Sequence, residues 1–185
     1  MFGVELLDPG SMAHRRSLKQ PGPSSPRRVF PQVAPTADQL SVWLAPGVMF
    51  DAVVDSMATN GFNHAGLQIF DGDLAVAFYQ VAPPDPTGEK VVAYGPPIPL
   101  PGGARIVMAS ITLGRTVDGK PILHCHGVLR DRQGKLYGGH IPTDLCVIGA
   151  EGVSAWAGVS KDAGFIVRPD TETGFSLLVP CEGNA

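Results

Sequence analysis

One segment of the chain has the hydrophobic spacing of an amphipathic helix. Residues 46–61, PGVMFDAVVDSMATNG, repeat their apolar positions at intervals of three and four, which places these side chains on one face of a helix. Pro46 suits the start of this helix, and Asn60-Gly61 suits its end. We expect one helix whose apolar side chains pack in the core: Met49, Phe50, Val53, Val54 and Met57.

The other hydrophobic segments are short and are separated by turn residues, a pattern typical of β-strands. The segment 83–103 contains seven prolines, and this density predicts a loop rather than a central strand. One helix among six or more short strands predicts an α+β domain with a mostly antiparallel sheet. The expected strands lie within 39–45, 63–70, 74–82, 105–115, 121–131, 137–140, 145–158 and 168–180.

Prolines set the N-terminal segment apart from the rest of the chain. Residues 8–36 contain six prolines with glycines and serines between them, and this composition predicts an extended arm without a core of its own. We expect an arm over 1–36, one domain over 37–181 and a tail over 182–185. The arm is either a disordered tail or a segment that wraps a neighbouring subunit or contacts phosphate.

Composition and charge narrow the class of protein. The chain has 185 residues, 44% of them hydrophobic, which suffices for one domain with a sizeable core. Residues 1–30 carry five basic against two acidic residues, a net +3, whereas the remainder carries nine against fifteen, a net −6. Because a compact duplex-DNA binder presents a basic face, any nucleic-acid affinity must come from the arm or from local clustering.

The cysteines and the N-terminus indicate where the protein acts. Cys125, Cys146 and Cys181 lack C-x-x-C spacing, and the first residues do not form a secretory signal, so a disulfide framework is not expected. Cys125 and Cys146 are expected to be small buried hydrophobes. No stretch approaches the roughly 20 apolar residues of a membrane helix. We expect a cytoplasmic protein without a membrane segment.

The candidate chemistry lies in residues 122–140, ILHCHGVLRDRQGKLYGGH. Side chains two apart on a strand point the same way, so His124 and His126 share one face. The turn at 131–134 folds the chain back, and His140 returns on the adjacent strand behind Gly138-Gly139. Three imidazoles with a fourth position open to water or substrate form the ligand set of a catalytic-type zinc site. The alternative is a group of hydrogen-bonded core histidines.

Glu151 is a second candidate for this site. It lies in VIGAEGV, which we expect to be an apolar strand, where a carboxylate is costly to bury without a partner. Glu151 could orient a ligand imidazole or act as a general base on metal-bound water. The alternative is a hydrogen-bonded glutamate on an edge strand. His64 is expected to cap or pack, and the chain has neither a G-x-S-x-G elbow nor a phosphate-binding glycine loop.

The segment 124–153 resembles the plants-and-prokaryotes-conserved (PPC) domain family. That family carries an H-x-H, a D-x-x-G turn, a G-G-H and an apolar strand that ends in Ala-Glu. The matching residues here are His124 and His126, Asp131 to Gly134, Gly138 to His140, and Ala150-Glu151. A looser resemblance covers roughly residues 38–157, and the two ends of the chain are similar to a bacterial subgroup.

The resemblance implies an α+β fold that assembles as a homotrimer. It also implies a zinc site, because the three histidines of bacterial members are similar to zinc ligands; here they are His124, His126 and His140. The family is often described as DNA-binding, because plant members join the domain to AT-hook segments. No Arg-Gly-Arg-Pro core of that kind occurs here. The family's usual Pro-Gly-Glu is Pro46-Gly47-Val48, which removes the basis for any activity that relies on that glutamate.

These observations favour a metal-binding protein of undetermined activity, with zinc or another imidazole-preferring divalent ion at an open three-histidine site. A small-molecule ligand would occupy the open position. One alternative is a DNA-binding or regulatory protein that uses the basic arm. Another is a trimeric scaffold in which the metal only stabilises the assembly.

Overall fold

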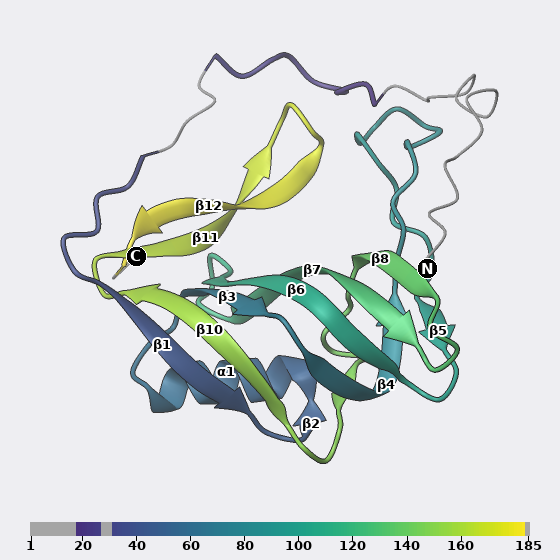
Figure 1. Ribbon diagram of the computed structural model, residues 1–185. Coiled ribbons are helices and arrows are strands. Elements are labelled where there is room, and N and C mark those ends of the chain that lie inside the picture. The colour runs from purple at the N-terminus through teal and green to yellow at the C-terminus, as the bar shows by residue number, and fades with distance from the viewer. Residues whose placement is uncertain (1–17, 27–30, 184–185) are drawn as a thin grey trace, which may run out of the picture.

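The chain folds around one curled β-sheet, and a single helix lies against one of its faces (Figure 1). The computed structural model describes residues 18–26 and 31–183. The helix α1 spans Met49–Thr59. The strands are β1 Ala37–Leu44, β2 Gly47–Val48, β3 Ala65–Ile69, β4 Gly72–Tyr79, β5 Ile98–Leu100, β6 Ala104–Arg115, β7 Pro121–Asp131, β8 Leu136–His140, β9 Val147–Ile148, β10 Val153–Ser160, β11 Ala163–Asp170 and β12 Phe175–Glu182.

β6 is the centre of the sheet. The order of strands is β1-β10-β3-β6-β4-β9-β2, and β6 also pairs with β7, which pairs with β8. Every ladder among the described residues is antiparallel except a single parallel pair between β6 and β11. The predicted α+β fold with a mostly antiparallel sheet is therefore confirmed.

The helix buries the face that its sequence pattern predicted. Met49, Val53 and Met57 are fully buried, and burying each side chain contributes about 1.5–3 kcal/mol to the free energy of folding. Its start differs from the prediction, because residues 47–48 pair with β9 before the helix begins. The first helical N–H groups, which lack partners within the helix, donate to the backbone carbonyls of Cys146 and Thr143.

Two parts of the predicted strand pattern are wrong. Residues 145–158 do not form one strand, because a turn closed by the Gly152 N–H on the Gly149 carbonyl separates β9 from β10. Gly152 has a φ of +67°, which favours glycine at this turn. The structure also adds β11, which the sequence pattern did not predict, and the short β5 inside the proline-rich segment.

The hairpin of β11 and β12 stands over the exposed face of β6 and β7 (Figure 1). Its tip is held from two sides: the Val91 N–H donates to the Thr173 carbonyl, and the Gly22 N–H donates to the Glu172 carbonyl at 3.1 Å. The Ser25 N–H also donates to the Glu172 carboxylate at 2.8 Å. The described part of the predicted arm thus contacts the hairpin, while residues 1–17 and 27–30 lie outside the described residues.

His64 forms a hydrogen bond with the base of the same hairpin. It is 5% exposed, and its Nδ1 accepts the Phe165 N–H at 3.1 Å, so the expectation that His64 packs is confirmed. Burial, and secondly the positive charge of Arg115, lower the pKa of His64 below 6.5. A proton on Nδ1 would also remove the acceptor of this hydrogen bond.

We therefore expect His64 to make the fold less stable in acid. A histidine whose pKa is lowered by folding binds more protons in the unfolded chain, so its contribution is complete above pH 6.5 and is lost as the pH falls below that value. The free energy of unfolding is measured in urea at pH 7.5 and at pH 5.5. Its decrease from pH 7.5 to pH 5.5 should be smaller for His64→Gln than for the natural chain. Parallel losses in the two proteins would contradict this role.

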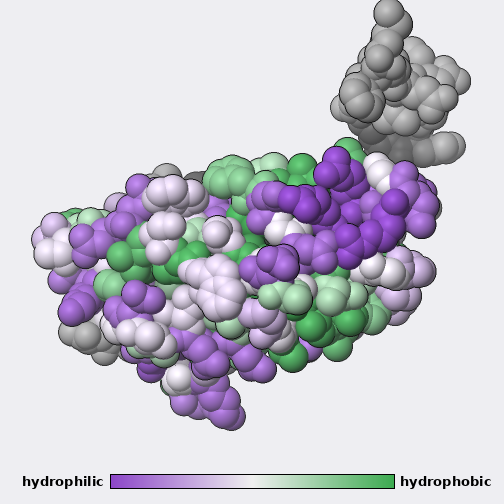
Figure 2. Space-filling view, turned by 60° about the horizontal axis from the view of Figure 1, so that its bottom comes forward, coloured by the Kyte–Doolittle hydropathy of each residue, from purple (hydrophilic) through white to green (hydrophobic). Residues whose placement is uncertain are grey.

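The surface shows no single continuous hydrophobic area in the view of Figure 2, where hydrophobic patches alternate with hydrophilic ones. Individual large apolar side chains are nevertheless exposed on the sheet, including Trp43 on β1 and Trp156 on β10, at 57% and 51%. Within the described ranges, no helix is both long enough and apolar enough to cross a bilayer.

Candidate metal centre

His126 lies in a row of side chains that crosses the exposed face of the sheet. The strand registers pair Trp156 with Gln68, Gln68 with Ser110, and Ser110 with His126. His124 lies two residues earlier on β7 and shares this face, while Cys125 between them is completely buried on the other. The alternation predicted for this strand is confirmed, and β7 has the predicted bounds, 121–131.

His140 completes the row from β8. The register pairs it with His126, so the predicted return of the chain after the 131–134 turn is confirmed. A second neighbour fixes the backbone of His140, because its N–H and carbonyl exchange two hydrogen bonds with Gln80, at 3.1 and 2.8 Å. Gly139 is required for this approach, since a Cβ there would lie 2.3 Å from the Gln80 carbonyl oxygen.

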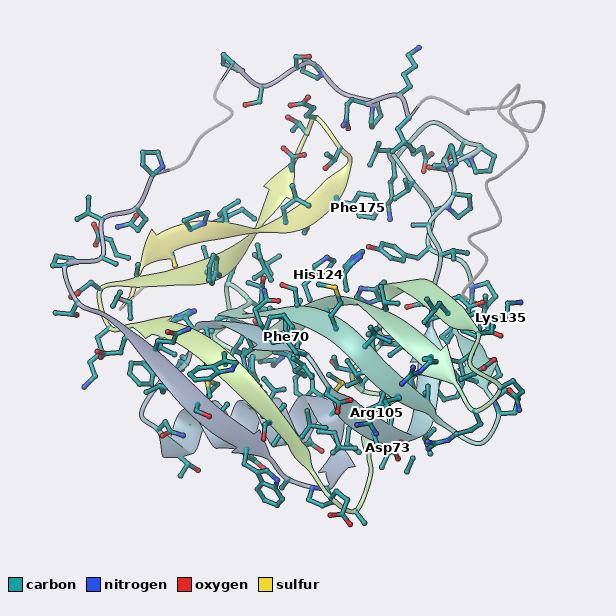
Figure 3. The ribbon with its side chains drawn as sticks, in the orientation of Figure 1. Phe70, Asp73, Arg105, His124, Lys135 and Phe175 are labelled. Carbon is teal, nitrogen blue, oxygen red and sulfur yellow. The ribbon has the colours of Figure 1, made fainter. Side chains whose placement is uncertain are left out.

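The three histidines form one cluster. One ligand-capable nitrogen from each of His124, His126 and His140 lies within 4.8 Å of the others. Their ring centroids are 4.8 to 5.5 Å apart. This spacing lets all three imidazoles reach a single ion with small side-chain rotations. Figure 3 shows His124 projecting from the sheet into the space below the β11–β12 hairpin.

The cluster favours neutral imidazoles. Burial lowers the pKa of His140 to about 4, and the neighbouring His124 and His126 contribute to this shift. Burial and His126 also lower the pKa of His124. Neutral imidazole is the form that binds metal, so protons do not compete strongly at these two residues near pH 7.

One atom of the cluster is buried without a partner. His140 Nδ1 has no hydrogen-bond partner, the one such buried side-chain nitrogen or oxygen found among the described residues. An unpaired buried polar nitrogen costs about 1–3 kcal/mol. A metal ion would satisfy a histidine nitrogen without requiring a hydrogen-bond donor. The donor set also fits zinc, which takes three imidazoles and one further ligand in open sites.

A cavity of about 470 Å³ adjoins His124 and His140. Its floor comes from β6 and β7, its roof from β11 and β12, and its outer side from the segment between β4 and β5. Most of its lining is apolar, and none of the Asp, Glu, Lys or Arg residues that the structure describes belongs to it. Tyr94 lies at the boundary with the cluster, its ring centroid 5.2 Å from that of His140.

The sequence pattern did not indicate the residues that build this cavity. Tyr94 lies in the proline-rich segment and Phe175 begins β12, yet their rings meet edge to face at 6.2 Å. Gln80 was placed only within an expected strand, although its backbone positions His140. The clearest signal in the sequence is an aromatic residue inside the proline-rich segment, Tyr94, and another directly after the turn residues 170–174, Phe175.

Glu151 does not lie on a strand, so that prediction is wrong. It is exposed in the turn between β9 and β10, and its carbonyl accepts the Trp43 indole N–H at 3.3 Å. Trp43 belongs to β1, which is four ladders away from β7 through β10, β3 and β6. Glu151 is not part of the histidine cluster. Its predicted catalytic role receives no support from this position.

The cysteines stay outside the cluster. Cys125 and Cys146 are fully buried and unpaired, as expected. Burial, with a smaller contribution from Cys146, raises the pKa of the Cys125 thiol to about 12. Burial likewise raises the pKa of Cys146 to about 11. A thiol with such a pKa is a poor nucleophile at neutral pH, so nucleophilic cysteine chemistry is not expected here.

Solved structures with the same fold exist. A metal-containing protein from Archaeoglobus fulgidus matches with a TM-score of 0.60 and 18% identity, over 83% of this chain and 99% of that one. A plant- and prokaryote-conserved (PPC) protein from Pyrococcus horikoshii matches with a TM-score of 0.60 and 16% identity, over 83% and 97%. A candidate DNA-binding protein from Ralstonia eutropha matches with a TM-score of 0.54 and 14% identity, over 76% and 89%.

No family model matches the chain, and no curated protein sequence does so either. The identities to these three structures are below 20%, so the likeness concerns the fold and not the activity. The structure and its neighbours together show that this chain has the fold of the PPC protein, as its histidine and glycine motifs predicted.

Proposed function

We propose that this chain is a metal-binding protein whose ion, most simply zinc, is held by His124, His126 and His140. The observation that carries the proposal is the buried, unpartnered Nδ1 of His140 within a cluster of three converging imidazoles. Hydrogen-bonded core histidines, the alternative interpretation, would each have a polar partner. The metal content of the Archaeoglobus fulgidus protein with this fold adds support.

The proposed site leaves one coordination position open toward the cavity. None of the described acidic or cysteine side chains joins the three histidines, so water, hydroxide or a ligand would complete a tetrahedral shell. A zinc ion in such a site supplies Lewis acidity and lowers the pKa of a bound water. Because Glu151 lies elsewhere, the proposal gives it no part as the general base.

We further propose that the chain assembles as a homotrimer, as the family resemblance implies. The exposed Trp43 and Trp156 support self-association, because large aromatic side chains on one sheet face are typical of interfaces. Their strands are adjacent, with Ser41 paired to Trp156 and Trp43 paired to Ser154. These side chains therefore lie close together on the sheet.

Native mass spectrometry of the full chain, expressed without an affinity metal, tests both parts of this function. We expect three chains per particle and one zinc, or another divalent ion, per chain. Chelation should remove the metal and leave the trimer, because the histidine cluster lies within one chain. A metal-free particle that takes up no added zinc would overturn the metal site, and a monomer would overturn the trimer.

DNA binding through the basic arm is the second candidate. It is supported by the candidate DNA-binding protein of Ralstonia eutropha, which shares the fold, and by the +3 charge of residues 1–30. The rest of the chain carries −6 and gives no general basic face. Removal of residues 1–30 separates the candidates, since it would abolish salt-sensitive duplex binding and leave the histidine cluster intact.

A further inference from the structure

The cavity beside the histidine cluster is lined on its other sides by parts of the chain that hold none of the proposed metal ligands. Figure 3 shows Phe175, at the start of β12, above His124 on β7. The cavity is lined by His124 and His140 but not by His126. An ion held by all three histidines would therefore lie at the edge of the cavity, next to the cluster. Any group bound at the open coordination position on this side would extend into about 470 Å³ of space.

The lining of the cavity selects for an apolar body. Tyr94 and Phe175 present ring surfaces, and Val167 and Leu178 add aliphatic surface from the hairpin. Apart from the two histidines, the polar side-chain groups of the lining are those of Gln80, Tyr94, Thr112 and Ser176. The Gln80 amide already donates to the Gly95 carbonyl at 2.8 Å. A sugar or nucleotide would lose its hydration here without finding enough hydrogen-bond partners. A volume of this size is ordinary for a small organic ligand.

The histidine cluster favours a ligand whose metal-binding group is anionic. Three neutral imidazoles leave both positive charges of a divalent ion uncompensated, and no described carboxylate or thiol joins the cluster. The described residues that line the cavity include no acidic side chain that could supply the missing negative charge. An oxygen anion is therefore the favoured fourth ligand in this low-polarity setting.

We propose that the cavity binds a small organic carboxylate, whose carboxylate oxygen completes the coordination of the metal and whose aromatic or branched apolar body lies between Tyr94, Phe175 and the β11–β12 hairpin. This inference rests on the proposed metal site. It adds the chemical class of the ligand, which neither the histidines nor the fold specifies.

Calorimetric titration of the zinc-loaded full-length protein tests this ligand class. The probes are 3-phenylpropanoate and propanoate, which share a carboxylate and differ by the phenyl ring. Burial of that ring should make 3-phenylpropanoate bind about ten- to hundredfold more tightly. Removal of the zinc should lower the binding affinity of both probes, because the ion that coordinates their carboxylates is then absent. Ligand-observed NMR provides a second readout that does not depend on heat.

Two aromatic substitutions provide a matched pair. Phe175→Ala removes a wall of the cavity, whereas Phe70→Ala removes a ring that is 63% exposed in the turn between β3 and β4. The preference for 3-phenylpropanoate should shrink several-fold in the first variant and stay unchanged in the second. Tyr94→Ala, in a loop rather than a strand, should shrink it as well and serves if Phe175→Ala does not fold.

The outcomes separate this inference from the proposed function. Zinc uptake, together with a strong preference for 3-phenylpropanoate over propanoate that depends on Phe175 or Tyr94, supports both the metal site and the ligand class. Zinc uptake with equal binding of the two probes overturns the ligand class alone. A phenyl preference that survives in the Phe175 and Tyr94 variants overturns the assigned cavity. Failure to take up zinc overturns the metal site and, with it, this inference.

Discussion

Replacing His140 by alanine is expected to lower the affinity for zinc by about a hundredfold or more. His140 is the least exposed residue of the three histidines, and two ligands alone form a weak zinc site. Even the loss of a residue that only supports a metal ligand typically costs 10–100-fold in affinity. Competition with a chromogenic chelator measures the effect directly.

The same substitution should have a different effect on the metal-free protein. His140 Nδ1 is buried without a partner there, so its removal also removes an unfavourable burial of a polar atom. The zinc-dependent rise in unfolding free energy, about 4 kcal/mol at a concentration a thousand times the natural Kd, should fall to about 1.4 kcal/mol or less at that concentration, while the metal-free protein stays about as stable as before. If His140 acts only as a packed core residue, the substitution should instead destabilise the metal-free protein and leave the zinc-dependent rise unchanged.

Glu151→Gln is the control for this experiment. The side chain is exposed in the turn between β9 and β10, outside the histidine cluster, so zinc affinity should remain within about threefold of the natural value. A large loss of affinity in this variant would restore the predicted link between Glu151 and the metal. It would also require a contact that the single chain does not contain.

Gly139→Ala is expected to damage the site without touching a ligand. The new Cβ would lie 2.3 Å from the carbonyl oxygen and 3.3 Å from the carbonyl carbon of Gln80, and these are backbone atoms rather than the end of a flexible side chain. The paired hydrogen bonds between His140 and Gln80 must then lengthen or break, which displaces the imidazole. We expect a loss of about 1–3 kcal/mol in stability and a marked loss of zinc affinity.

Gly138→Ala provides the matched control on the preceding residue. Its Cβ would meet only the Gly127 carbonyl oxygen at 3.8 Å, an ordinary contact. Thermal unfolding and zinc competition should therefore separate the two alanine variants clearly. Equal behaviour of the two variants would show that the approach of Gln80 to β8 does not position His140.

The parts of the fold that could be predicted are those with a local signal. The helix stripe of Met49, Val53 and Met57 repeats within eleven residues, and β7 alternates in the register that places His124 and His126 together. One short turn, at 131–134, was enough to predict that His140 lies on the strand next to β7. In each case the pattern and the structure that it predicts lie within a few residues of each other.

The parts that could not be predicted depend on distant segments. β11 has only a short apolar core, and its pairing with β12 and contact with β6 supply what its sequence lacks. Tyr94 and Phe175 meet only in the folded chain, so no spacing connects them to the histidines. The apolar neighbours of Glu151 predict a strand, although the glycines on either side of 150–151 favour the turn that the structure contains.

The order of strands in the sequence also gives the two parts of the site different times of formation. β6, β7 and β8 are consecutive, so the three histidines come together through contacts between near neighbours in the sequence, which form early in folding. The roof of the cavity contains β12, the last strand. During synthesis on the ribosome, all three histidines of the cluster are therefore made before the β11–β12 hairpin, which forms the roof of the cavity.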